Sequence, residues 1–402
     1  MAGWREWIWF AEQKTLGGRE RQLLLDHFGS PEGIFYAEAE EFRLLDGLNA
    51  RQIEALCDKS TAGCEKIMAD CQRLGIRVLT WQDADYPARL RNIFDPPCVL
   101  YVRGTLPLID EEVVIAMVGT RKATPYGIRS AEKLAFSLAK QGALVISGAA
   151  HGIDTAAHRG ALRAGKPTLA VLGCGLDVVY PEENRWLYAD IAACGALISE
   201  YPPGTAADGW HFPARNRILS GLSLAVTVVE APERSGALIT ANLALEQGRD
   251  VFAVPGPIDA PNSRGCHDLI ISGAGLAADS QDILRGYEAQ YPHKLTAYQG
   301  ETPQVFGAEA KRPQPEKKKE SKREAAEPER PVRTFRNSGW TDDQIALLRA
   351  MQRGISQADD LIDETQIPTR RVLSALTMLE IEGCVKQESG RQFSLIVDLR
   401  EE

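Results

Sequence analysis

Residues 118–127 read VGTRKATPYG, and residues 147–158 read SGAAHGIDTAAH. In each stretch an apolar run ends in a glycine-containing loop, and a helix-like pattern follows directly. Each stretch therefore predicts a strand that delivers a loop to the N-terminus of a helix. Because doubly wound α/β proteins bind phosphates at such helix N-termini, the two loops predict an α/β fold with a phosphate-binding edge.

The region around these loops is strongly basic. Between Val118 and Lys166 there are eight cations and two acids, Glu132 and Asp154, which give a local net charge of +6. The whole chain of 402 residues carries −9, so a nucleic-acid partner has to be argued from this patch and not from bulk charge. A loop that serves one nucleotide rarely needs a basic face of this size, and a polymer of phosphates is the expected partner. The cations are Arg121, Lys122, Arg129, Lys133, Lys140, Arg159, Arg163 and Lys166.

From about residue 80 to 290, apolar strand-like runs alternate with helical patterns. This alternation predicts βαβ units and a mostly parallel sheet. Right-handed crossovers place the C-terminal ends of parallel strands at one edge, where Gly119 and Gly148 then lie. The expected strands are residues 113–118, 144–147, 168–172, 196–199, 224–230 and 250–254.

An aromatic residue, two arginines and an asparagine stand close together in residues 212–221, FPARNRILSG. Guanidinium groups bind phosphates, and an aromatic ring can stack on an unpaired base. An alternative places Phe212 in the core and Arg215 and Arg217 in ion pairs at the surface. The basic loop favours the nucleic-acid interpretation, in which Phe212 stacks on a base and the two arginines neutralise phosphates together with Arg121 and Lys122.

A further strand-loop-helix pattern occurs in residues 230–246, EAPERSGALITANLALE. Its Ser-Gly pair opens the helix, so the backbone amides there can meet an anion. Helix-start amides at Gly148 and Gly152 are expected to act in the same way. The complete expected DNA-binding site is Gly119, Thr120, Arg121, Lys122, Ser147, Gly148, Gly152, Phe212, Arg215, Asn216, Arg217, Ser235 and Gly236.

No catalytic residue, metal site or cofactor is expected. His151, Asp154 and His158 have the spacing of a helix start, with Asp154 as its N-cap, and no third metal ligand is near. Residues 173–175, GCG, lack the third glycine of a dinucleotide-binding loop, because Val178 stands in its place. Eight cysteines without a C-x-x-C pair argue against zinc and for a reducing compartment. No run approaches the roughly 20 apolar residues of a membrane span, so we expect a cytoplasmic protein with no membrane partner.

The flanking regions differ from this core. Residues 1–75 predict an all-helical module of the SAM or helix-hairpin-helix type, in which Gly47 breaks two helices and Asn49 replaces the usual second glycine. Packing or protein contact is favoured there over DNA contact. Residues 76–295 form the expected core, and residues 296–338 a disordered, charged linker. Residues 339–402 predict a winged helix whose net charge from Thr341 onward, −5, favours a protein partner over DNA.

The ordered motifs VGTRKATPYG, SGAAHGIDTAAHRGAL, LAVLGCGLDVVYPEEN, FPARNRILSGLS and VVEAPERSGALITANLALEQGRDVFAVPG resemble the DNA-processing protein A family, DprA, also called Smf. The resemblance spans about residues 80–280. It implies an extended Rossmann-like core that forms a homodimer. It also implies a non-enzymatic function: binding and protecting single-stranded DNA and loading the RecA recombinase during natural transformation. The family usually has asparagine where this chain has His267.

A rival interpretation is an enzyme on the same scaffold, similar to the nucleotide phosphoribohydrolases that resemble lysine decarboxylases. Those enzymes carry a P-G-G-x-G-T loop followed by a glutamate. This chain lacks the double glycine and places Glu246 a full helix later. The single-stranded DNA-binding function is therefore the main expectation.

Overall fold

A computed structural model describes residues 3–295, 332–334, 340–353, 357–387 and 392–400. The chain divides into two compact units, one before and one after residue 309, and each is described by itself. Within the described residues, no helix is both long enough and apolar enough to cross a membrane.

The centre of the first unit is one sheet, which contains nine of the described strands in the order β1-β2-β6-β5-β4-β3-β7-β8-β9. From β6 to β9 all neighbours are parallel, while β1 and β2 extend one edge in antiparallel pairing. The apolar runs predict six of these strands and miss β1, β2 and β9. The strands are β1 (Arg77–Thr80), β2 (Val99–Gly104), β3 (Val114–Val118), β4 (Leu144–Ser147), β5 (Thr168–Leu172), β6 (Ala196–Ser199), β7 (Ala225–Val228), β8 (Asp250–Ala253) and β9 (Gly275–Leu276).

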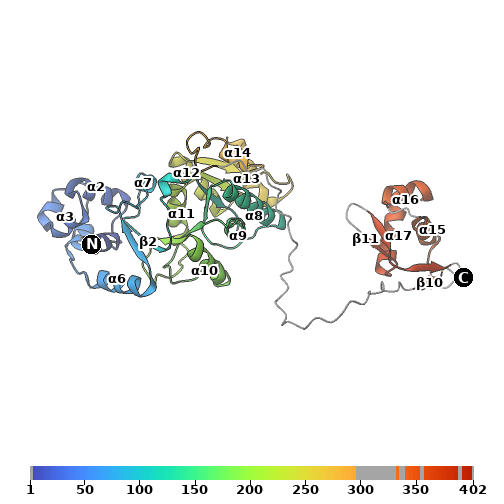
Figure 1. Cartoon of the computed structure of the whole chain (residues 1–402), viewed down its shortest axis with the longest axis horizontal. Helices are drawn as coiled ribbons and strands as arrows, with labels where there is room; N and C mark the ends of the chain where they lie inside the picture. The colour runs from blue at the N-terminus through green and yellow to red at the C-terminus, as the bar shows by residue number, and fades with distance from the viewer. Residues whose placement is uncertain (1–2, 296–331, 335–339, 354–356, 388–391, 401–402) are drawn as a thin grey trace. The chain divides into compact units, whose positions relative to one another are not determined.

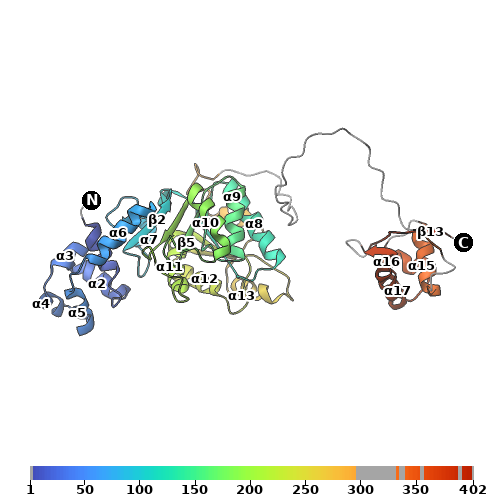
Figure 2. The same ribbon diagram turned by 90° about the horizontal axis from the view of Figure 1, so that it is seen from below.

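Helices cover both faces of the sheet, which explains why its central strands are apolar throughout. Along β3, Val114 and Ala116 pack toward α7, α11, α12 and α13, while Ile115 and Met117 pack toward α8, α9 and α14. Figure 2 shows α11, α12 and α13 on one side and α8, α9 and α10 on the other. These helices are α7 (Ala88–Arg91), α8 (Pro125–Lys140), α9 (Ile153–Arg163), α10 (Arg185–Cys194), α11 (His211–Leu222), α12 (Gly236–Glu246), α13 (Arg264–Ile271) and α14 (Ser280–Leu284), with 3₁₀ turns at Ile109–Glu111, Glu182–Asn184 and Pro261–Ser263.

The helical region at the N-terminus packs against this sheet (Figure 1). Ile8, Phe10 and Phe42 belong to the same buried apolar cluster as Tyr101 of β2 and Leu197 of β6. Residues 3–75 therefore share a core with the α/β part. The helices are α1 (Trp4–Ala11), α2 (Gly18–Phe28), α3 (Pro31–Tyr36), α4 (Ala39–Arg43), α5 (Ala50–Cys57) and α6 (Ala62–Leu74).

The expected helix-hairpin-helix turn is not formed between α4 and α5. Gly47 has a positive φ of 118°, but Asn49 is extended at φ −93° and caps α5 by accepting a hydrogen bond from the Gln52 amide. That motif needs two left-handed positions to turn its amides toward a phosphate. Asn49 acts as a helix cap instead, because its short side chain reaches the amide three residues on.

The second unit confirms the expected winged helix. Three helices are followed by the hairpin of β11 and β12, around a core that includes Leu347, Leu376 and Phe393. Strand β13 pairs in parallel with β10, Val332–Thr334, so part of the expected linker belongs to this unit; its other residues up to 331 and 335–338 lie outside the described residues. The elements are α15 (Asp342–Gln352), α16 (Ala358–Thr365), α17 (Thr369–Ile381), β11 (Val385–Gln387), β12 (Phe393–Leu395) and β13 (Asp398–Arg400).

Candidate functional site

The strand order reverses next to β3. This strand pairs with β4 on one side and with β7 on the other. Strands β4 and β5 continue the sheet toward one edge, and β7 and β8 continue it toward the other. Open α/β sheets bind ligands in the crevice at such a switch point. The loop after β3 is held there, because the Thr120 amide donates to the Glu230 carbonyl at 2.7 Å.

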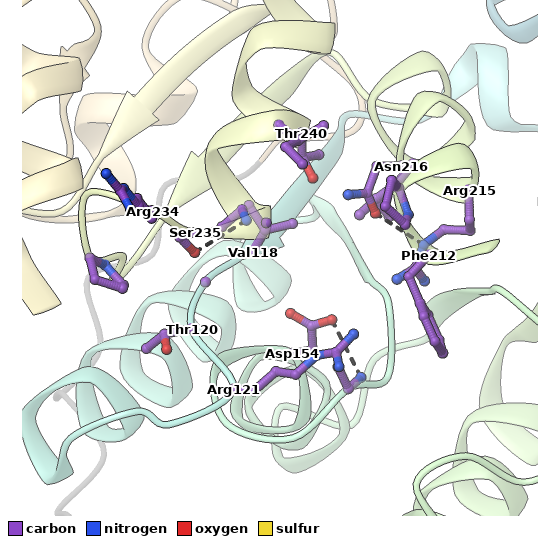
Figure 3. A pocket seen from close by; sticks show the side chains of 18 of the residues that line it. Val118, Thr120, Arg121, Asp154, Phe212, Arg215, Asn216, Arg234, Ser235 and Thr240 are labelled. Carbon is purple, nitrogen blue, oxygen red and sulfur yellow. Dashed lines mark hydrogen bonds between the residues drawn. The ribbon is translucent and has the colours of Figure 1, made fainter. Parts of the chain in front are cut away.

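A cavity of about 360 Å³ opens at this switch point. In Figure 3, Phe212, Arg215 and Asn216 project from α11 on one side, Arg234 and Ser235 lie on the opposite side, and Arg121 and Asp154 lie between them. The cavity brings together eight of the thirteen expected site residues from three separate segments. These eight are Gly119, Thr120, Arg121, Phe212, Arg215, Asn216, Ser235 and Gly236.

Arg121 lies over the ring of Phe212. The central carbon of its guanidinium is 5.1 Å from the ring centroid, a cation–π arrangement, and the side chain is otherwise exposed. The ring of Tyr180 lies on Phe212 as well, with centroids 5.2 Å apart and a tilt of 34°. Phe212 thus holds Arg121 at the cavity while leaving its positive charge accessible to a phosphate.

Arg215 is buried behind this pair. Its guanidinium donates to the carbonyls of Gly148, at 3.2 Å, and of Val171, while Nε donates to the side chain of Asn216. Burial lowers the pKa of Arg215, and the Asp154 carboxylate opposes that shift. Arg215 therefore supplies a fixed positive charge in the wall of the cavity, oriented by backbone carbonyls.

The carboxylate of Asp154 organises the second glycine loop. One oxygen accepts hydrogen bonds from the amides of Gly148, at 3.2 Å, and Ala150, at 3.4 Å. Burial raises the pKa of Asp154, while Arg215 and these amides favour the charged form. The expectation that Asp154 is an N-cap is wrong, because Gly152 occupies that position at the start of α9. Nor is the Gly148 amide free for DNA, since it already binds Asp154.

Gly152 and Ser147 support the site without lining the cavity. Gly152 has φ +76°, and a Cβ there would lie 2.4 Å from the Thr120 carbonyl oxygen, so only glycine lets the two loops approach. The Ser147 hydroxyl is buried and donates to the Met117 carbonyl at 2.6 Å. Both residues therefore hold the loop that carries Arg121.

Arg217 is turned away from the cavity, unlike its neighbours in the FPARNR motif. Its guanidinium donates to both carboxylate oxygens of Glu200, at 2.8 and 2.7 Å, and Nε donates to the Asp95 carbonyl. Burial opposes its charge, yet Glu200 and then Asp95 raise the net pKa of Arg217 above its usual value. The structure does not bring Arg217 to the cavity, and its packing matches the ion-pair alternative. Lys122 is exposed and also lies outside the lining.

The start of α12 forms the wall opposite α11. Ser235 caps this helix by accepting from the Ala237 amide at 3.3 Å, and the space beside Gly236 is open. Sequence reasoning missed Arg234, which lines the cavity from an exposed position. The sequence does carry a signal for Arg234, because this arginine directly precedes the Ser-Gly pair that starts the helix.

Three histidines considered from the sequence, His151, His158 and His267, take no part in the cavity lining. Burial lowers the pKa of His158 to about 3, and its Nδ1 lies 2.8 Å from the Thr168 hydroxyl. His151 lies 3.6 Å from Glu183 at the surface. His267 is on α13, where Nε2 is 3.0 Å from the Gly256 carbonyl oxygen. Among the described residues, no group of three or more His, Cys, Asp and Glu side chains is arranged to hold a metal ion.

Two family models match the chain. The model described as DNA recombination-mediator protein A matches residues 77–288, which include every strand of the large sheet and the whole cavity. The model described as DprA winged helix domain matches residues 320–391. The first match covers the α/β part of the first unit, and the second covers most of the second unit.

Individual relatives agree with these matches. Protein Smf of Synechocystis sp. is 34% identical over 406 residues, which cover 96% of this chain and 97% of that protein. DNA processing protein DprA of Streptococcus pneumoniae is 47% identical over 206 residues, or 51% of this chain and 72% of that protein. The X-ray structure of DprA from Streptococcus pneumoniae superposes with a TM-score of 0.63 at 35% identity, covering 71% of this chain and 98% of that one.

Proposed function

This chain belongs to the DNA recombination-mediator protein A family, DprA or Smf, and we propose that it binds and protects single-stranded DNA and loads the RecA recombinase onto it during natural transformation. The observation that carries the proposal is the position of Arg121 against Phe212 beside the cavity, with the buried charge of Arg215 behind them. Cations and an aromatic ring are what a phosphate and an unpaired base require.

The geometry favours a single strand over a duplex for a steric reason. A cavity of about 360 Å³ is at the small end of ligand pockets and admits one nucleotide unit. In a duplex the bases are paired and stacked inside the helix, so their faces cannot reach an aromatic ring beside the cavity. Contacts to phosphates and ring faces also carry little base identity, and sequence preference should be weak.

The direct test is the affinity for a fluorescent single-stranded oligonucleotide and its duplex, measured by anisotropy over a range of salt. We expect preference for the single strand, and Arg121→Ala should weaken binding and reduce the salt slope by about one unit. Arg103→Ala removes an exposed cation of β2, which lies beside the start of β6 at the sheet edge opposite to the cavity, and is the matched control. Equal binding by the Arg121→Ala and wild-type proteins would refute the site.

RecA loading and dimerisation through the core are inferred from the family and need their own measurements. Filament growth of RecA on single-stranded DNA should accelerate with the wild-type protein and much less with Arg121→Ala. Sedimentation of the wild-type protein should give the mass of a homodimer. The rival enzyme has no comparable support, because Glu246 is at the far end of α12 from the cavity, roughly 15 Å along the helix.

A further inference from the structure

Tyr180 extends the aromatic surface beyond the cavity. Its ring lies against Phe212, with centroids 5.2 Å apart, and 41% of the residue is exposed. It does not line the cavity itself. It is therefore an exposed aromatic ring in contact with Phe212 outside the cavity lining.

Phe212 is already in contact with several groups. Arg121 lies over its ring, Tyr180 packs on it, and the backbone at Gly173 is so close that a Cβ would be 3.0 Å from the Phe212 ring. Phe212 is only partly exposed as a result. Among the described residues, Phe212 is the ring partner found for Tyr180, which leaves much of the tyrosine open to solvent.

The backbone of Tyr180 is held in place by a buried neighbour. The hydroxyl of Tyr188 donates to the Tyr180 carbonyl at 2.8 Å and accepts from the Tyr180 amide at 3.4 Å. Further along the same loop, the Asn184 amide group donates to the Ala149 carbonyl at 2.9 Å, which ties this loop to the second glycine loop. A ring on such a fixed backbone loses little conformational freedom when a base stacks on it.

We propose that Tyr180 is a second stacking platform for single-stranded DNA, which receives the base adjacent to the nucleotide at the cavity. This inference rests on the proposed function and extends the contact surface of the same site. Every base has a flat face, so the contact tolerates any sequence. The ring is neutral, so it adds affinity without adding to the salt dependence that phosphate contacts produce.

The test compares Tyr180→Leu, Tyr180→Ala and Tyr180→Phe for binding to a ten-nucleotide single strand. Leucine retains an apolar contact with Phe212 but provides no stacking face. We expect the Leu and Ala variants to lose about 5- to 150-fold in affinity, the range for one base–aromatic contact, with an unchanged salt slope. The Phe variant should bind like the wild type. Tyr36→Ala, which removes a tyrosine 66% exposed on α3, is the control for loss of any surface ring.

Oligonucleotide length provides a second readout. A mononucleotide reaches only the cavity, so its affinity should be the same for the wild type and Tyr180→Leu. Wild-type affinity of Tyr180→Leu for the ten-nucleotide strand would overturn the stacking role, and so would a loss accompanied by a smaller salt slope. If the wild-type protein itself does not bind single strands, the proposed function fails; if it binds and Tyr180→Leu binds equally, only this inference fails.

Discussion

Arg217 and Glu200 form an ion pair in which two guanidinium nitrogens meet two carboxylate oxygens, at 2.8 and 2.7 Å. The pair joins α11 to the end of β6, and Asp95 extends it to the loop after α7 through contact with the Arg217 Nε at 3.3 Å. The ion pair therefore anchors one face of α11, while Phe212, Arg215 and Asn216 on another face of this helix line the cavity.

Loss of this pair should cost stability and leave the DNA charge contacts intact. Arg217→Ala leaves the largely buried Glu200 carboxylate without its arginine, while Asp95 keeps its ion pair with Arg21, and we expect a loss of about 3 kcal/mol in the free energy of unfolding, measured in urea. Combining Arg217→Met with Glu200→Leu should recover part of it. The salt slope of DNA binding should match the wild type. A salt slope lower by one unit would instead show that Arg217 contacts a DNA phosphate.

The contact between the two glycine loops predicts contrasting effects of alanine. Gly152→Ala places a Cβ 2.4 Å from the Thr120 carbonyl oxygen at a φ of +76°, and we expect a loss of at least about 2 kcal/mol together with weaker DNA binding. Gly236→Ala meets nothing within 4 Å and should be nearly neutral in stability. Urea unfolding of the two variants checks the contrast. Equal stability of the two variants would contradict the close approach of the loops.

Burial of neutral His158 should make the protein less stable in acid. The Thr168 hydroxyl donates to the Val145 carbonyl, so Nδ1 of His158 must carry the proton, and Nε2 is buried without a partner. The pKa of His158 is about 3 when folded and near 6.5 when unfolded, so the unfolded chain binds more protons between these values. Stability is then fully present above pH 6.5 and falls by roughly 1.4 kcal/mol per pH unit below it.

The measurement for this effect is the free energy of unfolding from pH 7.5 to 5. The wild-type protein should lose about 2 kcal/mol more than His158→Gln over this range. His151→Gln, which replaces a histidine at the surface, should follow the wild type. Parallel curves for the wild type and His158→Gln would show that His158 is not held neutral.

The cap at Asn49 predicts a stability effect without a DNA effect. Asn49→Ala removes the acceptor for the Gln52 amide and should cost about 1 kcal/mol, whereas Asn49→Gly should cost only a few tenths. Thermal unfolding can resolve the ranking. A clear gain in DNA affinity for Asn49→Gly would contradict the assignment of this residue as a cap, because glycine would then be restoring a hairpin that binds phosphate.

The parallel strands, the winged helix and much of the cavity could be predicted from the sequence because their signals are local. Apolar runs that end in glycine mark β3 and β4, and their order requires the loops to meet at one sheet edge. The signals for β1 and β9 are weak, because Arg77–Thr80 is an edge strand buried only in part and β9 has two residues. Strand β2 does carry a continuous apolar run, VLYV, which sequence reasoning missed.

The orientation of the side chains in the FPARNR motif can be predicted from the sequence if the motif is treated as helical. At 3.6 residues per turn, Phe212, Arg215 and Asn216 share one face, whereas Arg217 is turned about 140° from Phe212. An interpretation that treats the motif only as a cluster of cations cannot distinguish Arg217 from Arg215. The structure makes it, because α11 packs on the sheet and only one of its faces meets the cavity.

The sequence alone determined the fold class, the family and the loop that carries Arg121, since apolar periodicity and glycine position depend on residues close together in the chain. Only the tertiary structure decided that Arg217 pairs with Glu200 and Asp95, that Asp154 binds the amides of its own loop, and that Tyr180 lies on Phe212. The partners of Arg217 and Tyr180 come from different elements, and these contacts exist only when the packed core brings those elements together. The contact of Asp154 depends instead on the backbone conformation of its own loop.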